Sequence, residues 1–351
     1  MSVSDTHQPN QLEVSADHAG ARLDRFVRQM VPGASFGLVQ KLARKGALRV
    51  NGKRAKADAR LDQGDLVFLP NSLVAAMTGA DASDPAIQGD PQVHAIVQTL
   101  RESLVLDQDD LIAFNKPSGL AVQGGSKTRV HVDGVLAHFA DAQGREPKLI
   151  HRLDRDTSGL LLTARGALAR ELAGQFADRS TKKRYLAWCW GCPAQPQGTV
   201  DAPLGKAAVG PNRQERVRVD AHQGQAATSV YRVVHSDYCQ GGETPDGQRS
   251  AKPPRLSLIE WRPLTGRTHQ LRVHAEHLGN AILGDLKYGQ PPRLDALPYA
   301  KDLSSARLML HALSLEISVQ GRHNRLIAPI PDDFKRIGAL VGFDDWGSFT
   351  E

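Results

Sequence analysis

Positive charge is concentrated in one short segment of this chain and is absent from the next, a pattern that predicts separate domains. Residues 20–60 contain 11 Lys or Arg and two acidic residues, whereas residues 71–100 contain no Lys or Arg. The cation-free stretch is rich in Gly, Ala, Asp and Ser, a composition that buries little apolar surface. A chain of 351 residues also exceeds the length at which one hydrophobic core keeps growing. We therefore expect a small basic domain over residues 20–70, a flexible linker over 71–103 and a larger domain after it.

Composition indicates a soluble protein of a reducing compartment. Hydrophobic residues make up 40% of the chain, which is enough for packed cores, but no run approaches the roughly 18 apolar residues of a membrane helix. The first ten residues lack both a charged start and an apolar stretch, so no signal peptide is expected. Three cysteines, an odd number, argue against a disulfide framework. We expect a cytoplasmic protein with no membrane contact.

The basic segment has the pattern of a small α+β domain. Residues 21–27 place apolar side chains at helical spacing, and residues 36–46 predict a second helix that ends at a glycine. Residues 47–53 predict a strand that runs into an Asn-Gly turn, which favours a tight hairpin. Residues 64–70 supply a closing strand.

This basic segment resembles an S4 RNA-binding domain. The resemblance implies that the second helix and the hairpin present basic side chains to structured RNA, which is recognised through its backbone and shape. A solvated basic face is the alternative. The expected contacts are Lys41, Arg44, Lys45, Arg49, Lys53 and Arg54.

A chemical signal lies in residues 151–165, which read HRLDRDTSGLLLTAR. Asp154 stands between Arg152 and Arg155, and cationic neighbours keep a carboxylate ionised. The apolar run at 160–162 predicts a buried strand that would anchor the carboxylate. An ordinary Asp at a strand-entry turn is the alternative.

Three further blocks occur with this one in a fixed order. They read FNKPSGLAV at 114–122, KRYLA at 183–187 and LTGRTHQLRVH at 264–274. Together the four blocks resemble the signature of the RluA-type pseudouridine synthases, and the resemblance covers about residues 104 to 330.

The resemblance implies an α+β catalytic domain over residues 104–335, with a mixed, mostly antiparallel sheet around an RNA-binding cleft. The residue pattern agrees, because a helix-like stretch at 166–178 interrupts short β-branched runs without regular βαβ alternation. Residues 240–254 are rich in Gly, Pro and polar residues and predict a surface loop. We expect residues 1–19 to be a disordered tail and residues 336–351 a C-terminal tail.

The implied activity is isomerisation of uridine in RNA to pseudouridine, in which the N1–C1′ bond breaks and the base rejoins through C5. A carboxylate can assist by adding to the base or by attacking the sugar, and the sequence leaves both routes open. The family match assigns Asp154 as this nucleophile. The neighbouring Asp156 precedes Thr-Ser-Gly and is interpreted as a turn-stabilising residue.

Two more catalytic residues follow from the resemblance. Arg267 matches the arginine that pairs with the nucleophilic aspartate and keeps it charged; a surface salt bridge is the alternative. Tyr185 matches the tyrosine that stacks on the target base and helps to move the C5 proton. Core packing is the alternative for Tyr185.

The target uridine must leave its stack to reach a carboxylate in a cleft. Arg152 matches the residue that fills the vacated space, and a simple charge partner for Asp154 or Asp156 is its alternative. Arg155 is expected to contact RNA beside it. Leu271 is carried over as an apolar wall of the uracil pocket, although a core leucine is an equal alternative.

Neither a metal nor an organic cofactor is expected. Cys189 and Cys192 form a pair, but the third cysteine, Cys239, stands alone, and a structural zinc site needs four ligands. The histidines between residues 269 and 277 do not form a His-Glu-x-x-His motif.

The expected substrate is ribosomal RNA. Gln123 is followed by Gly124 and Gly125 where many relatives have His followed by Pro, and this variation resembles the branch that carries an S4 domain and modifies 23S ribosomal RNA. The alternatives are the same reaction on transfer RNA and a non-catalytic RNA-binding assembly factor. We expect a monomer.

Overall fold

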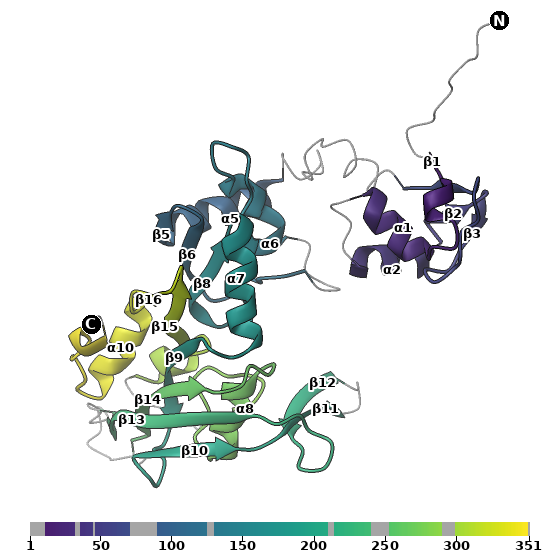
Figure 1. The fold of residues 1–351 in the computed structure, drawn as a ribbon. Coiled ribbons are helices and arrows are strands. Elements are labelled where there is room, and N and C mark those ends of the chain that lie inside the picture. The colour runs from purple at the N-terminus through teal and green to yellow at the C-terminus, as the bar shows by residue number, and fades with distance from the viewer. Residues whose placement is uncertain are drawn as a thin grey trace, which may run out of the picture. The chain divides into compact units, whose positions relative to one another are not determined.

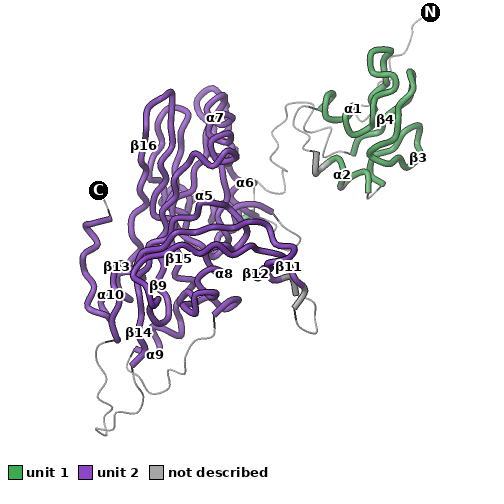
Figure 2. The backbone as a smooth tube through the Cα atoms, turned by 60° about the horizontal axis from the view of Figure 1, so that its bottom comes forward, with its two compact units in different colours: residues 1–90 green, residues 91–351 purple. Residues whose placement is uncertain are grey.

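The computed structural model describes residues 11–31, 36–44, 46–70, 90–124, 130–209, 214–239, 253–289 and 299–349. The chain divides into two compact units, Met1–Asp90 and Pro91–Glu351, which Figure 2 shows in separate colours. Each unit has its own hydrophobic core.

Unit 1 is a small α+β domain, as the sequence predicts. Its four-stranded sheet has the order β1-β4-β2-β3. Asn51 and Gly52 both adopt positive φ, the backbone conformation that a two-residue hairpin turn requires, and they join β2 to β3. The elements are β1 (Gln11–Glu13), η1 (Ala16–His18), α1 (Leu23–Met30), α2 (Phe36–Arg44), β2 (Arg49–Val50), β3 (Lys53–Arg54) and β4 (Leu66–Phe68).

The N-terminal boundary of this unit differs from the prediction. Residues 11–19 were expected in a disordered tail, but β1 pairs with β4 and Val14 is buried in the core. Val14 belongs to the core of unit 1 and Leu12 packs against it, and burying these apolar side chains stabilises the pairing of β1 with β4. Residues 1–10 lie outside the described residues.

Unit 2 is built on a ten-stranded sheet (Figure 1). Its main path has the order β10-β13-β14-β9-β15-β8-β6-β5; β16 pairs with β15, and β7 with β8. Only the β15–β8 pair is parallel among the described strands, so the expected mostly antiparallel sheet is confirmed. The strands are β5 (Leu104–Gln108), β6 (Leu111–Lys116), β7 (Lys148–Leu149), β8 (Ser158–Ala164), β9 (Lys182–Trp190), β10 (Gln197–Asp201), β13 (Thr228–Tyr238), β14 (Arg255–Pro263), β15 (Leu310–Val319) and β16 (Arg322–Ile327), with β11 (Leu204–Val209) and β12 (Gln214–Val219) forming a separate pair.

Helices cover this sheet. Apolar side chains of α7 pack on β8 and β15, and those of α10 pack on a second cluster around Trp188. The helices are α5 (Pro91–Glu102), α6 (Val132–Val135), η2 (Leu136–Phe139), α7 (Gly166–Ala177), α8 (Gln270–His277), α9 (Ala300–Ser304), α10 (Asp332–Leu340) and η3 (Gly347–Phe349).

Two predicted boundaries of unit 2 are wrong. The last third of the expected linker forms α5, which buries Val93, Val97 and Leu100; the spacing of these three residues places them on one helix face. The expected C-terminal tail is part of the core, because α10 extends to residue 340 and Phe349 is buried. Residues 71–89 and most of the predicted 240–254 loop lie outside the described residues.

The central strands bring distant motifs together. Ala312 in β15 pairs with Gly159 in β8 on one side and with Tyr185 in β9 on the other. The loop before β8 and the start of β9 therefore lie across a single strand, although they are about 30 residues apart in the sequence.

Gly159 allows this close pairing. Its φ is +112°, and a Cβ at this position would overlap the backbone of Ala312. We expect Gly159→Ala to lower the free energy of unfolding by at least about 3 kcal/mol, because it adds backbone strain to an overpacked contact. Urea unfolding measures this effect. Gly174→Ala in α7, where the added Cβ meets nothing within 4 Å, is the matched control, and equal stability of the two variants would contradict the argument.

Candidate active site

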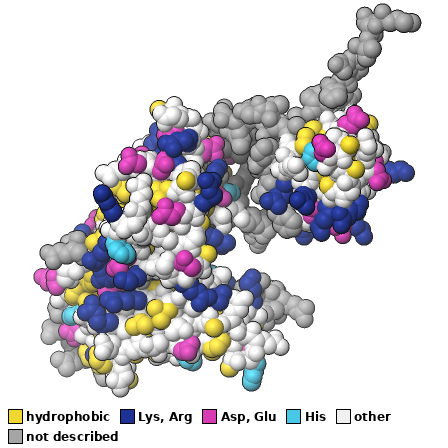
Figure 3. All heavy atoms as spheres, viewed as in Figure 1, with side chains coloured by type: hydrophobic (Ala, Val, Ile, Leu, Met, Phe, Trp, Pro, Cys, Tyr) yellow, Lys and Arg dark blue, Asp and Glu magenta, His cyan; other side chains and the backbone are white. Residues whose placement is uncertain are grey.

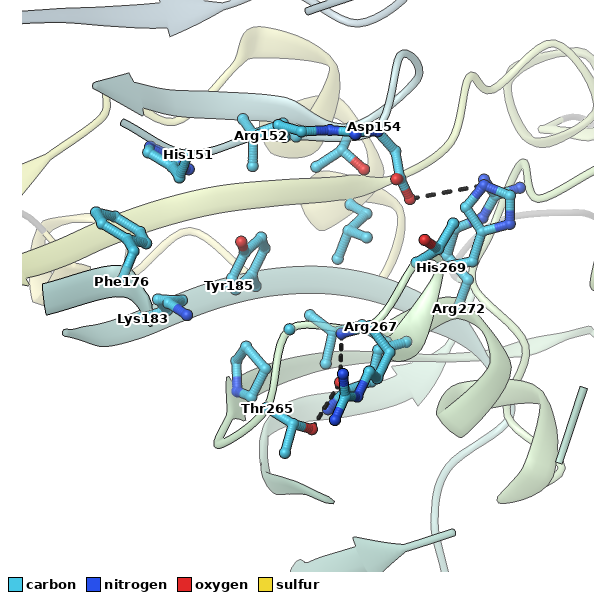
Figure 4. A pocket seen from close by; sticks show the side chains of 18 of the residues that line it. His151, Arg152, Asp154, Phe176, Lys183, Tyr185, Thr265, Arg267, His269 and Arg272 are labelled. Atoms are coloured by element: carbon cyan, nitrogen blue, oxygen red, sulfur yellow. Dashed lines mark hydrogen bonds and ion pairs between the residues drawn. The ribbon is translucent and has the colours of Figure 1, made fainter. Parts of the chain in front are cut away.

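A cavity of about 480 Å³ opens where the loop before β8, the strand β9 and the start of α8 meet (Figure 4). It contains residues from three of the four sequence blocks. The lining consists of residues 150–154, 263 and 265–272, together with Thr157, Phe176, Lys183, Tyr185 and Leu310.

Asp154 lies in the loop between β7 and β8, and its side chain is 29% exposed. The block at residues 114–122, which does not line the cavity, holds this loop in place. The buried Lys116 donates hydrogen bonds to three carbonyl oxygens, those of Pro117, Leu120 and Arg155. Burial lowers the pKa of Lys116 to about 7, while the carboxylate of Asp156 opposes this shift. Three carbonyl acceptors match the three N–H groups of the ammonium form, so Lys116 connects the turn after β6 to the Asp154 loop.

His151 fixes the other end of this loop. Its Nε2 accepts a hydrogen bond from the backbone N–H of Leu162 at 3.0 Å, and its ring stacks on Phe176 with a centroid distance of 4.6 Å. Burial lowers the pKa of His151 to about 3. The ring is therefore neutral at pH 7, as an acceptor nitrogen requires.

The charge environment of Asp154 corrects the sequence prediction. Among the described basic side chains, His269 and not Arg267 lies within 4 Å of Asp154, with Nε2 3.9 Å from Oδ2. The Nε of Arg267 instead donates to the carbonyl oxygen of Ala226 at 3.1 Å. Arg267 lines the same cavity, but among the described contacts it does not form the expected pair with Asp154.

Arg272 is the cation that the sequence interpretation missed. It forms a buried two-pronged pair with Asp285, with both distances at 2.7 Å. Burial lowers the pKa of Arg272, but hydrogen bonds and attraction from Asp285, with a further contribution from Asp154, raise it above its ordinary value. A fixed, permanently charged guanidinium therefore faces the Asp154 carboxylate. Arg267 and Arg272 occur in one block, and spacing alone did not show which of them the fold turns inward.

His269 was also missed as a site residue. It adopts left-handed backbone (φ +56°) immediately before α8, and its Nδ1 lies 2.6 Å from the hydroxyl oxygen of Tyr288. Burial lowers the pKa of His269, although the charge of Asp154 opposes this. A neutral ring whose Nδ1 accepts a hydrogen bond from the Tyr288 hydroxyl directs its Nε2–H toward Asp154.

Tyr185 lies where the family resemblance predicts, on the cavity wall at the start of β9. Burial raises the pKa of Tyr185 far above its ordinary value, and the charge of Asp154 adds to this shift. The phenol therefore stays protonated at neutral pH. Beside it, the ammonium of Lys183 lies 5.3 Å from the centre of the Phe176 ring.

The remaining predicted RNA contacts of this unit divide between two places. Arg152 is exposed and lines the cavity. Leu271 is 6% exposed and belongs to both the cavity wall and the hydrophobic core. Arg155 does not line this cavity; it pairs with Asp156 at 2.9 Å and lines a neighbouring one.

The predicted RNA contacts of unit 1 lie on its surface. Arg44, Arg49, Lys53 and Arg54 are exposed, and Arg44 and Arg54 line a cavity of about 450 Å³. Figure 3 shows Lys and Arg side chains gathered along one side of this unit. Lys45 and the side chain of Lys41 lie outside the described residues.

Within the described part of the chain, no three His, Cys, Asp or Glu residues form a group that could hold a metal ion. All three cysteines are free. None of the described helices is long and apolar enough to cross a membrane.

A buried histidine behind the Asp154 loop makes stability depend on pH. His311 is 0% exposed, with Nδ1 3.0 Å from the hydroxyl oxygen of Ser158, and burial lowers its pKa to about 3. The unfolded chain binds this proton below about pH 6.5 and the folded chain only near pH 3, so stability is lost as the pH falls through this window. In His311→Gln, the slope of unfolding free energy against pH should decrease by about 1.4 kcal/mol per pH unit between pH 6 and 4. Urea unfolding across this range measures the slope, and the exposed His323→Gln is the control; equal slopes in the two variants would disprove the assignment.

Comparison with known proteins agrees with this geometry. The family model for RNA pseudouridylate synthase matches residues 110–277, and the S4 domain model matches residues 21–67. A protein of Rickettsia typhi named ribosomal large subunit pseudouridine synthase C is 33% identical over 90% of this chain and 95% of its own length. The chain belongs to the RNA pseudouridylate synthase family. It is an isomerase that converts uridine in RNA to pseudouridine, and the family resemblance, the fold class and the S4 domain expected from the sequence are confirmed.

Other relatives of the pseudouridine synthase support this placement. A protein of Vibrio cholerae with the same printed name is 34% identical over 87% of each chain. The solved structure of human RNA pseudouridylate synthase domain containing 4 is similar with a TM-score of 0.56 and 25% identity, covering 72% of this chain and 98% of that one.

Proposed function

We propose that this pseudouridine synthase acts on large-subunit ribosomal RNA with Asp154 as its nucleophile, and that it works in the cytoplasm as a monomer. The observation that carries the site assignment is the position of Asp154: a half-buried carboxylate in a 480 Å³ cavity, facing Arg272 and flanked by Tyr185. Cavities of about 300–1,000 Å³ are typical for small ligands, so one flipped nucleotide fits this size. The relatives named for the large ribosomal subunit support the substrate class.

The reaction requires no redox step. The N1–C1′ bond breaks, the uracil turns, a C5–C1′ bond forms, and the hydrogen on C5 leaves to solvent while N1 gains a proton. Asp154 assists by adding to the base or by attacking C1′. Arg272 supplies a fixed positive charge beside this carboxylate. The neutral phenol ring of Tyr185 stacks on the uracil, and Leu271 supplies an apolar wall.

The flipped uridine leaves a gap in the RNA stack. Arg152, exposed at the rim of the cavity, fills this gap with its planar guanidinium group. Arg267 contacts the RNA at the rim of the cavity, where its Nε donates a hydrogen bond to the carbonyl oxygen of Ala226.

The test is release of tritium from RNA labelled at C5 of uridine. We expect release from 23S ribosomal RNA transcripts and none from transfer RNA transcripts. Release from transfer RNA alone would move the substrate to that class, and absence of release from both would favour the non-catalytic assembly factor. Mapping pseudouridines in a strain that lacks the protein then identifies the positions.

The S4 domain supplies sequence-independent affinity through its basic face. In the full chain, replacing Arg49, Lys53 and Arg54 together by Gln should lower the slope of log affinity against log salt by about two to three, because fewer counterions are released. Filter binding of the 23S transcript measures this slope. The control removes three exposed cations of unit 2, Arg101, Lys148 and Lys335. An equal loss in the control would refute a special role for the S4 face.

A further inference from the structure

A second cavity, of about 820 Å³, adjoins the catalytic pocket. His269 and Arg272 line both cavities, so together they form a shared wall. The volume exceeds that of the catalytic pocket itself, and all described lining residues belong to unit 2. The reaction chemistry described above does not use this space.

Positive charge dominates the second cavity. Arg155, Arg216, Lys287 and Arg307 line it in addition to the shared arginine, and one carboxylate, that of Asp156, lies among the described lining residues. Charges of one sign in a concave surface focus the electrostatic potential.

Ion pairs behind the wall hold two of these arginines in place. Arg307 forms a two-pronged pair with Asp333 at 2.6 and 3.0 Å, and Arg216 pairs with Glu276 at 2.9 Å. Neither carboxylate lines the cavity. The guanidinium groups are therefore fixed at the wall, an arrangement that suits phosphate oxygens.

One apolar side chain stands in this basic surrounding. Leu286 lines the cavity and is 94% exposed, far more than any other large hydrophobic side chain among the described residues. Burying such a side chain in a complex is favourable, and a nucleobase offers a flat apolar face.

The turn that carries Leu286 is rigid. A Cβ on Gly284 would overlap the backbone carbonyl of Arg307, so the turn packs directly against the backbone that leads into β15. The carboxylate of Asp285 accepts hydrogen bonds from the backbone N–H groups of Lys287 and Tyr288 at 2.9 and 3.0 Å. The same carboxylate binds Arg272, so the position of Leu286 is fixed relative to the catalytic pocket.

We propose that the second cavity binds the phosphodiester backbone beside the flipped uridine, and that Leu286 packs against the neighbouring base. This inference rests on the proposed function and adds the path of the RNA strand. A nucleotide in the catalytic pocket keeps its flanking phosphates, and the space across the shared wall of His269 and Arg272 is open to them. A protein partner would account for the exposed leucine but not for the fixed cations around it.

The first test uses tritium release from labelled 23S transcripts. We expect Leu286→Ser to lower kcat/KM about tenfold through loss of an apolar contact, and Leu286→Met to retain wild-type activity. Leu104→Ser on β5 is the control, because Leu104 is also exposed and lines neither cavity. Equal activity of Leu286→Ser and Leu104→Ser overturns the proposal and leaves a protein partner as the occupant of this surface.

The second test measures charge in the same cavity. Lys287→Gln should lower the slope of log affinity against log salt for the 23S transcript by about one, and Arg101→Gln, outside both cavities, serves as its control. Equal slopes contradict the phosphate site. If the wild-type protein releases no tritium, the proposed function fails. If it releases tritium and both variants match their controls, only the proposed path of the RNA strand fails.

Discussion

Asp154→Asn abolishes tritium release while leaving the protein folded and able to bind RNA. The amide has the shape of the carboxylate but cannot form the covalent bond, so we expect kcat to fall by at least about 10⁴-fold. Little stability is lost, because Asp154 is partly exposed and its nearest described basic side chain, the neutral His269, is 3.9 Å away. Single-turnover assays with excess enzyme, together with filter binding, separate lost chemistry from lost affinity.

Asp156→Asn is the matched control, two residues away in the same loop. Its carboxylate pairs with Arg155 and lines the second cavity instead of the catalytic pocket. We expect a loss of less than about tenfold, typical for an exposed ion pair. The opposite result, an active Asp154→Asn and an inactive Asp156→Asn, would assign the nucleophile to Asp156.

Arg272→Met is expected to lower both stability and activity. The substitution leaves Asp285, whose side chain is 0% exposed, as an unpaired buried charge, which costs about 3–5 kcal/mol of unfolding free energy. It also removes the fixed cation that faces Asp154. Urea unfolding measures the first effect, and tritium release below the unfolding transition measures the second.

A double variant separates these two effects. Combining Arg272→Met with Asp285→Asn removes the buried charge, so much of the lost stability should return. Activity should stay low, since the cation is still absent. Recovery of activity together with stability would show that Arg272 acts only in folding.

Arg267→Met distinguishes the two arginines of the block. Its Nε donates a hydrogen bond to a backbone carbonyl at the rim, and none of the buried carboxylates in the described ranges pairs with it. We expect stability close to wild type and a smaller fall in activity than for Arg272→Met. A larger fall would restore Arg267 as the partner of Asp154 in the RNA-bound enzyme.

Local sequence determined much of this protein. The Asn-Gly pair predicted the hairpin of unit 1 because both residues tolerate positive φ. The apolar run after Asp154 predicted β8, since a strand buried on both faces has no polar alternation. The four ordered blocks predicted the family and placed Asp154, Tyr185 and Arg267 in one site, and all three line one cavity.

The errors in the boundaries came from giving average composition priority over spacing. Val93, Val97 and Leu100 repeat at helical intervals, yet the polar stretch before them led to their assignment as linker. The final residues lacked a comparable local signal. Trp346 and Phe349 are ordered because they pack near Trp188 from β9, more than 150 residues away in the sequence.

The electrostatic partner of the nucleophile was decided by the tertiary structure alone. Arg267 and Arg272 are both part of one motif, but α8 begins at Gln270 after a left-handed His269, and this geometry turns Arg272 toward Asp285 and Asp154. Asp154 comes from a distant loop, and Asp285 lies beyond the end of α8. Sequence spacing describes which residues share a helix or strand, whereas the direction of a side chain and the field around it depend on residues that only folding brings close.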